Sequence, residues 1–283
     1  MLILTSSNYR GGMGASFGPA EASTWIAVPG PQDDKYSRGV VGFVTGSARY
    51  PGAAVLGVEA ALRTGVGMVR YLGAGRPTRL VLQRRPEAVT AEGRVQAWVV
   101  GSGQDAGDVD ELTAAYRDRA LSDPVPTVID AGALGSAHDA AGARVLVPHA
   151  GELATLLGRD RVEVEADAAA SALDAAARLR SVVLLKGHTS YIADPDGGLL
   201  EVASAPAWTA TAGAGDALAG VLGALLATHA LELEADPGIV APLAATAAVL
   251  HGLAAERASA GGPFTVMDLC GELPAVVRDL LRG

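Results

Sequence analysis

From residue 39 onward, apolar segments of strand length alternate with Ala-rich segments of helical spacing, and this alternation limits the folds open to the chain. Continuous apolar strands separated by helices indicate a mainly parallel sheet covered on both faces. We therefore predict an α/β fold of three layers. The expected strands are 40–45, 67–72, 96–101, 126–132, 144–148 and 181–187, with helices at 51–65, 110–120, 163–180 and over most of the C-terminal part, and a hairpin at 190–203.

The domain organisation follows from length and composition. A chain of 283 residues can form one large domain or two small ones with buried cores. No low-complexity linker divides it, and it shows no internal repeat. Residues 1–38 carry many Gly, Ser and Pro residues and the cluster DDKYSR, as is typical of a loosely structured segment. We predict an N-terminal arm over residues 1–38 and a single domain over residues 39–283.

Composition argues against several classes of partner. The net charge of −9 and an aromatic content of 4% disfavour nucleic acid, which needs a basic face. Cys270 is the only cysteine, so the chain can form neither an intrachain disulfide nor a cysteine metal cluster, as suits a reducing cytosol. No signal peptide is evident, and the apolar stretches 217–230 and 240–255 are short for a membrane span. We predict a cytoplasmic protein with no nucleic-acid or membrane partner.

The segment ATAGAGDALAGVLG, residues 210–223, carries the strongest chemical signal. Gly213 and Gly215 let the backbone approach a ligand, and the following helix directs free N–H groups and its positive dipole end there. A transferring phosphoryl group is the natural occupant. An aspartate beside phosphate repels it, so Asp216 makes chemical sense as a base that deprotonates a hydroxyl attacking phosphorus. The alternative is a carboxylate that only stabilises its own helix.

Three further segments lie where an expected strand meets a loop or helix, the edge at which open α/β sheets bind ligands. Lys186 ends the strand of LLKGHTSYIADPDG and could face a nucleotide, or could be a solvated lysine. His149 and Glu152 in VPHAGELATLLG could line a site, or form a turn with a capped helix. The small residues 52–54 that open the expected helix 51–65 could admit a flat ring, or only allow close packing.

Taken together and in this order, these segments resemble the NAD(P)H-hydrate dehydratases, a branch of the ribokinase-like superfamily. GAGD alone points only to the superfamily, whereas PHAGE and YPGAA point to the dehydratase branch. The resemblance runs from about residue 35 to about residue 274. The matching stretches are KYSRG (35–39), GSARYPGAAVLGVEAALRTGVGMV (46–69), RPEAV (85–89), VIDAGAL (128–134), VPHAGELATLLG (147–158), VLLKGHTSYIADPDG (183–197), ATAGAGDALAGVLGALLA (210–227), HGLAAE (251–256) and TVMDLCGELP (265–274).

This resemblance implies a ribokinase-like fold and the repair of NADH or NADPH to whose nicotinamide ring water has added, as the 6S hydrate. In that chemistry ADP (or ATP) phosphorylates the ring hydroxyl and leaves as AMP (or ADP), and the ring nitrogen then expels phosphate. The Ala-, Gly- and Arg-rich composition favours a bacterial source and hence ADP. The resemblance also implies Mg²⁺ as a neutraliser of phosphate charge, with no ligands assigned.

The resemblance also implies a set of site residues. Asp216 would be the base and would contact the hydrated ring. The other implied contacts are an anion hole at Gly213, Ala214 and Gly215, adenine-nucleotide contacts at Lys186, Gly187, His188, Thr189, Ser190 and Gly215, and hydrated-dinucleotide contacts at Ala53, Gly103, His149 and Asp216.

Five positions depart from the family pattern. Gly132 replaces a second aspartate, Ser102 the proline of a Gly-Pro-Gly turn, and Val147 a threonine. Pro206 stands in place of an asparagine and Ala212 in place of a glycine. None of these changes removes the proposed base or the helix N-terminus.

Two other functions share these motifs. A ribokinase-like kinase of a small molecule, such as a vitamin-precursor alcohol, would use the same base and anion hole. A nucleotide-binding protein without catalysis would bind nucleotide but not turn it over. By the resemblance we also expect a homo-oligomer, with a tetramer suspected. We expect the dehydratase half alone, with a possible separate epimerase in the pathway, because residues 1–38 are too few to hold the epimerase domain fused to many relatives.

Overall fold

The computed structural model describes residues 14–283 except 106, 108 and 204. Within these residues a nine-stranded sheet forms the centre, in the order β1-β9-β8-β7-β6-β5-β4-β2-β3. Its neighbouring strands run parallel except in the β7–β8 and β8–β9 pairs. The strands are β1 (Ala15–Ser16), β2 (Val40–Val44), β3 (Met68–Tyr71), β4 (Ala97–Val100), β5 (Thr127–Ile129), β6 (Arg144–Leu146), β7 (Val182–Leu185), β8 (Ser190–Ala193) and β9 (Leu199–Val202).

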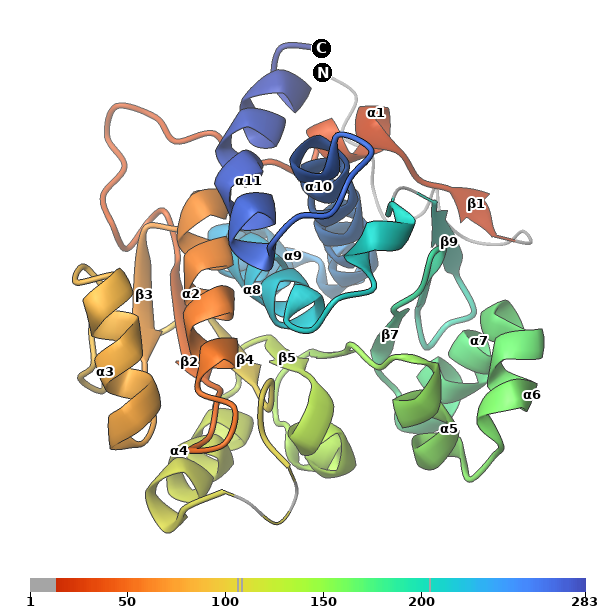
Figure 1. Ribbon diagram of the computed structural model, residues 1–283, viewed down its shortest axis with the longest axis horizontal. Helices are drawn as coiled ribbons and strands as arrows, with labels where there is room; N and C mark the ends of the chain where they lie inside the picture. The colour runs from red at the N-terminus through yellow and green to blue at the C-terminus, as the bar shows by residue number, and fades with distance from the viewer. Residues whose placement is uncertain (1–13, 106, 108, 204) are drawn as a thin grey trace.

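Helices cover both faces of the sheet (Figure 1). One layer contains α2, α8, α10 and α11, and the other contains α4, α5, α6 and α7. The α-helices are α1 (Pro19–Ser23), α2 (Gly52–Thr64), α3 (Gly75–Arg84), α4 (Glu111–Ser122), α5 (Ala150–Leu157), α6 (Arg161–Ala166), α7 (Ala168–Leu179), α8 (Ala214–Thr228), α9 (Ala230–Ala235), α10 (Val240–Ser259) and α11 (Val266–Leu280), with short 3₁₀ segments η2 (Ala131–Asp139), η3 (Ala207–Thr209) and η4 (Pro237–Ile239).

The strands are apolar on both faces because each face has its own core. Val41 and Phe43 of β2 point into the cluster with α2 and α8, whereas Val40 and Val44 point into the opposite cluster. The four side chains are fully buried. Alternate residues of one strand therefore serve opposite layers, as a doubly covered parallel sheet requires.

The α/β fold of three layers is confirmed, and each expected strand and helix has a counterpart in the structure. The helix α3 was missed, because GRPTRLVLQR is rich in arginine and lacks a long apolar stripe. The carboxyl ends of the parallel strands meet at one edge, where α8 begins and where β7 leads into the β8–β9 hairpin. This edge holds the residues of the proposed site.

The N-terminal arm packs more closely than its composition suggests. Ala15 and Ser16 pair in parallel with β9, and Phe17 and Ala22 are buried in the core. The described part of the arm is therefore attached to the domain, because burial of these two apolar side chains stabilises it there despite the many Gly and Ser residues around them. Its first 13 positions lie outside the described residues, and the boundary at residues 38 and 39 stays a prediction.

One helical segment is longer than the apolar stretch read from the sequence. Pro237–Ser259 spans 23 residues and is apolar enough to cross a membrane. However, 89% of its most apolar window is buried inside the protein. Such burial is the pattern of a core helix, and α10 indeed packs on α8 and α11.

Candidate active site

The N-terminus of α8 is built to receive an anion. Gly213 precedes the helix with φ of +95°, a left-handed conformation that favours glycine, and a Cβ atom there would lie 2.5 Å from Leu56. No side chain of the described residues caps this helix end. The Ala214 N–H group donates to the Thr211 carbonyl oxygen at 3.3 Å, whereas the N–H groups of Gly215 and Asp216 have no acceptor among the described residues and can bind a ligand.

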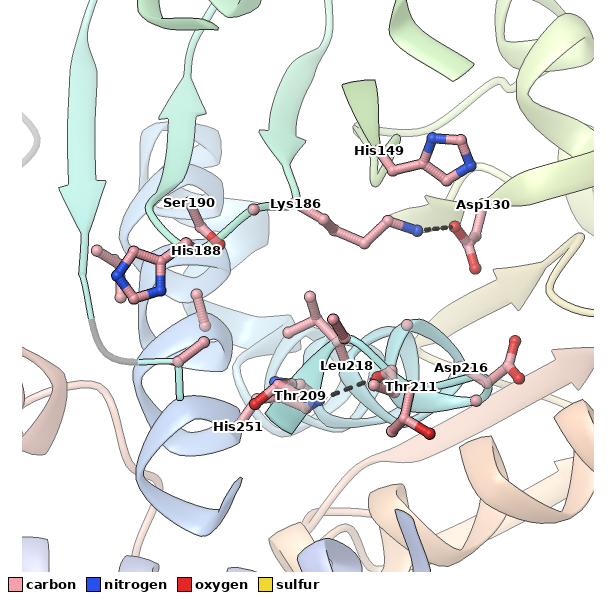
Figure 2. A pocket seen from close by; sticks show the side chains of 18 of the residues that line it. Asp130, His149, Lys186, His188, Ser190, Thr209, Thr211, Asp216, Leu218 and His251 are labelled. Carbon is pink, nitrogen blue, oxygen red and sulfur yellow. Dashed lines mark hydrogen bonds and ion pairs between the residues drawn. The ribbon is translucent and has the colours of Figure 1, made fainter. Parts of the chain in front are cut away.

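Asp216 lies in the first turn of this helix and faces the pocket (Figure 2). Burial raises the pKa of its carboxyl group, and the negative charge of Asp130 raises it further, while Lys186 opposes the shift. The result is a pKa of about 7. Among the described residues no hydrogen-bond donor to this carboxylate is found, so it is poised to take a proton near neutral pH.

Lys186, which is partly exposed, and the buried Asp130 form an ion pair opposite Asp216 (Figure 2). The Lys186 Nζ atom donates to Asp130 Oδ1 at 2.8 Å and lies 3.9 Å from Glu152 Oε2. Burial disfavours the charged amine, but these two carboxylates outweigh it, so the pKa of Lys186 is raised. The pocket therefore contains a permanent ammonium group that can neutralise phosphate.

His251 of α10 supports the same helix end. Its Nε2 atom lies 2.9 Å from the Ala214 carbonyl oxygen, so the proton belongs on Nε2 and is donated to that oxygen. Burial lowers the pKa of His251 to about 4. The neutral ring thus ties α10 to the first turn of α8.

A pocket of about 580 Å³ joins these groups, a volume suited to a nucleotide-sized ligand. Its polar walls come from the ends of β5, β6 and β7 and from the start of α8, and its apolar end comes from residues near η3 and α10. The lining residues are Asp130, Ala131, His149, Glu152, Lys186, Gly187, His188, Ser190, Val202, Ala205, Pro206, Ala207, Thr209, Ala210, Thr211, Gly213, Ala214, Gly215, Asp216, Leu218, Ala248 and His251.

Most of the expected site residues line this pocket. The whole expected anion hole and Asp216 lie on one wall, and Lys186, Gly187, His188 and Ser190 lie on another. Thr189 instead lines a neighbouring cavity of about 450 Å³, together with Arg161 and Tyr191. His149 borders both cavities. The ring of His149 also caps α5, since its Nδ1 accepts hydrogen bonds from the N–H groups of residues 151 and 152.

Ala53 and Gly103 lie outside the residues that line the large pocket. They adjoin each other, because a Cβ atom at Gly103 would lie 2.3 Å from the Ala53 Cβ atom. Their segment is nevertheless near the helix end, since Leu56 of the same helix as Ala53 touches the position of Gly213. A ligand contact at these two residues stays a prediction.

Sequence reasoning missed two members of the site. Asp130 ends β5 in the motif VIDAGAL, and an aspartate after a buried strand is itself a signal for a site residue. His251 lies in HGLAAE, which was recognised as a matching stretch but given no role. A histidine in a buried helix gives no local sign of its partner, which lies 37 positions away.

A glycine-led helix N-terminus, an aspartate beside it and a lysine at a strand end are the features that this site shares with the ribokinase-like class. The model of one family, described as NAD(P)H-hydrate dehydratase, matches residues 41–270. The chain belongs to this family.

Named relatives and solved structures agree with this assignment. The chain is 44% identical to the bifunctional NAD(P)H-hydrate repair enzyme Nnr of Mycobacterium tuberculosis over 73% of this chain and 44% of that protein. It is 35% identical to the ADP-dependent (S)-NAD(P)H-hydrate dehydratase of Xanthomonas campestris, over 90% of this chain and 94% of the other. The ADP/ATP-dependent NAD(P)H-hydrate dehydratase of Bacillus subtilis, co-crystallised with ATP and Mg²⁺, shares 26% identity and a TM-score of 0.81 over 93% of this chain and 97% of the other.

The relatives also differ in length. The chain spans about half the length of the bifunctional repair enzymes that it matches, which include those of Mycobacterium and Corynebacterium. A ribokinase-like protein of Enterococcus faecalis, at 20% identity and a TM-score of 0.80, supports the fold alone. The expected ribokinase-like architecture is confirmed by these similarities.

Proposed function

We propose that this protein is an ADP-dependent dehydratase of the 6S hydrates of NADH and NADPH. The observation that carries the proposal is the placement of Asp216, a desolvated carboxylate in the first turn of an uncapped helix, facing the Lys186 ammonium in a nucleotide-sized pocket. The Xanthomonas and Bacillus relatives named above support the choice of reaction and phosphoryl donor.

Asp216 is the base of the first step. The ring hydroxyl oxygen attacks the terminal phosphorus of ADP, the bond from that phosphorus to the bridging oxygen breaks, and AMP leaves. Asp216 takes the hydroxyl proton as the new oxygen–phosphorus bond forms. The N–H groups at Gly213 and Gly215, with Ala214 between them in the anion hole, and the Lys186 ammonium stabilise the negative charge on the transferring group.

The second step breaks the bond between the ring carbon and the phosphate oxygen. The lone pair of the ring nitrogen expels phosphate from the phosphorylated carbon, and the neighbouring carbon then gives a proton to the departed phosphate, which restores the ring double bond. Phosphorylation matters because hydroxide is a poor leaving group near neutral pH, whereas phosphate is a good one. The products are AMP, phosphate and NADH or NADPH.

The binding residues divide between the two ligands. Lys186, Gly187, His188, Thr189, Ser190 and Gly215 would hold the adenine nucleotide, whose ring fits the apolar end of the pocket. Ala53, Gly103 and His149 would contact the hydrated dinucleotide together with Asp216. With ATP as donor, ADP would leave in place of AMP.

The site fits a Mg²⁺ ion that arrives with the nucleotide. In the part of the chain that the structure describes, no three His, Cys, Asp or Glu side chains gather as a metal site. Proteins commonly bind Mg²⁺ through one or two carboxylates and the phosphates of the substrate. Glu152 in the pocket wall offers one such carboxylate, and the ion would neutralise phosphate charge.

Several features outside the pocket belong to the same proposal. The protein would act in the cytoplasm as a homo-oligomer, with a tetramer suspected, and without a nucleic-acid or membrane partner. A separate epimerase would supply the 6S hydrate from its 6R epimer. The acidic composition argues against a nucleic-acid partner, and the bifunctional relatives, which combine two activities in one chain, motivate the separate epimerase.

The test is absorbance at 340 nm with purified protein, hydrated NADH, Mg²⁺ and ADP, ATP or no nucleotide. The proposal expects a rise that needs nucleotide and is faster with ADP than with ATP. Intact nucleotide binding with no rise from either nucleotide would refute the dehydratase. Phosphorylation of an alcohol without recovery of NADH would then indicate a small-molecule kinase, and binding without any turnover a silent nucleotide-binding protein.

A further inference from the structure

Three side chains from three strand ends meet beneath the pocket. Ser102 follows β4, Asp130 follows β5 and Lys186 follows β7. The Ser102 hydroxyl donates to Asp130 Oδ2 at 2.9 Å, and Lys186 Nζ donates to Asp130 Oδ1 at 2.8 Å. Both carboxylate oxygens of Asp130 are therefore occupied, and Ser102 and Asp130 are each 2% exposed.

This arrangement fixes the direction of the Asp130 carboxylate. A buried carboxylate with a single donor can rotate about its side-chain bonds, whereas one held at both oxygens keeps one orientation. The hydroxyl comes from Ser102, at the position where the family pattern has proline. Proline has no side-chain donor, so this chain holds its aspartate by a contact that proline cannot make.

The ammonium held by Asp130 lies against the first turn of α8. A Cβ atom at Gly215 would lie 3.3 Å from Lys186 Nζ. The positive charge of Lys186 and the N–H groups of Gly215 and Asp216, which have no acceptor among the described residues, thus lie close together. The terminal phosphoryl group of ADP needs both, whereas AMP lacks that group.

We propose that Asp130, oriented by Ser102, is a positioning residue that holds the Lys186 ammonium at the binding site of the transferred phosphoryl group. The proposal rests on the nucleotide site described above. Without Asp130, the nearest remaining carboxylate is that of Glu152, 3.9 Å from Lys186 Nζ. Lys186 would then turn toward Glu152 or lose its proton in a buried setting, and either change weakens its contact with phosphate.

The test compares the affinities for ADP and AMP by titration calorimetry in the same buffer containing Mg²⁺. Asp130→Ala should lower the preference for ADP over AMP by about tenfold, with AMP affinity kept within about threefold. Ser102→Ala, the milder variant, should lower the preference for ADP about threefold. Ser102→Thr, which keeps a hydroxyl, should show the same preference as the wild type. If Asp130→Ala fails to fold, the comparison of Ser102→Ala with Ser102→Thr still tests the proposal.

Ser181→Ala is the matched control. Ser181 is also 2% exposed and makes one side-chain hydrogen bond, to the Leu179 carbonyl, but it lies at the opposite end of β7. It should leave the ADP preference unchanged. An unchanged preference in both Asp130→Ala and Ser102→Ala, a tighter ADP complex, or an equal loss of ADP and AMP affinity would overturn the proposal. Because this test measures binding and not turnover, the positioning role of Asp130 can be refuted while the dehydratase activity is confirmed. The dehydratase activity can likewise be refuted while the positioning role is confirmed.

Discussion

Two carboxylates on packed helices, Glu59 of α2 and Asp216 of α8, have opposite properties. The helices touch closely, since a Cβ atom at Gly220 would lie 2.2 Å from the Gly57 carbonyl oxygen. The Glu59 side chain is fully buried but bonds to Arg63, Arg84 and Arg85. Asp216 faces the pocket, and among the described residues the one cation that acts on it is Lys186, which is paired with Asp130.

The difference in partners sets the difference in pKa. Burial alone would raise the pKa of Glu59, but the three guanidinium groups outweigh it and lower the pKa to about 2. Burial also raises the pKa of Asp216, the charge of Asp130 raises it further, and with Lys186 opposing the shift the pKa is about 7. A buried carboxylate is therefore structural when cations surround it, and suited to proton transfer when they do not.

The largest expected effect is that of Asp216→Asn on turnover. The amide keeps the shape of the side chain but cannot take a proton, so kcat should fall by roughly 10³-fold or more. ADP affinity, measured by calorimetry, should stay within about threefold, because the helix N-terminus and Lys186 remain. Full activity in this variant would remove Asp216 from the role of base.

Glu59→Ala should affect stability and leave chemistry alone. The change leaves three arginines facing a cavity and should lower the free energy of unfolding by about 3 kcal/mol at pH 7. Since the pKa is lowered, the stabilising contribution of Glu59 is present above its ordinary pKa of 4.5 and is lost as the pH falls toward 2. Urea unfolding at pH 7 tests this, and kcat per folded molecule should stay within twofold. A large loss of kcat in fully folded Glu59→Ala protein would contradict a purely structural role for Glu59.

The pH dependence of the rate should follow Asp216. Its deprotonated form is the base, so kcat/KM should rise with pH and level off above the pKa of about 7. At pH 6 the value should be roughly tenfold below the plateau. Calorimetric ADP affinity at both pH values serves as the control. A profile flat between pH 6 and 8 would show that another group accepts the proton.

The smallest expected effect is a gain in stability from Asp216→Asn. A carboxyl whose pKa is raised from 3.8 to about 7 contributes its full stability below pH 3.8 and loses it as the pH rises through 7. The variant should therefore be more stable than the wild type by about 1–2 kcal/mol at pH 8, and by less at pH 5. Thermal unfolding at the two pH values tests the sign, and a variant less stable at pH 8 would contradict it.

The sequence predicted the Asp216 side of the site because that side is local. One short segment, GAGD, contains both the glycines that begin the helix and the aspartate of its first turn. The strand pattern likewise placed Lys186 at a strand end, since continuous apolar runs of strand length are local signals.

The partners of these residues could not be predicted in the same way. The Lys186–Asp130 contact spans 56 positions and depends on β6 lying between β5 and β7 in the sheet. The Arg84 and Arg85 contacts with Glu59 depend on the end of α3, an arginine-rich helix whose buried face consists of Pro77 and Val81. Strand order and helix packing are tertiary features, so they decide the pKa values that the sequence leaves open.

The most direct measurement is titration of the Asp216 carboxyl carbon by NMR in protein labelled with ¹³C at the aspartate carboxyl groups. The resonance that is missing in Asp216→Asn identifies the residue. We predict that this resonance titrates with a pKa of about 7, well above the ordinary aspartate value of 3.8. A pKa near 4 would show that Asp216 is solvated or paired like an ordinary carboxylate, and would contradict the account of its role.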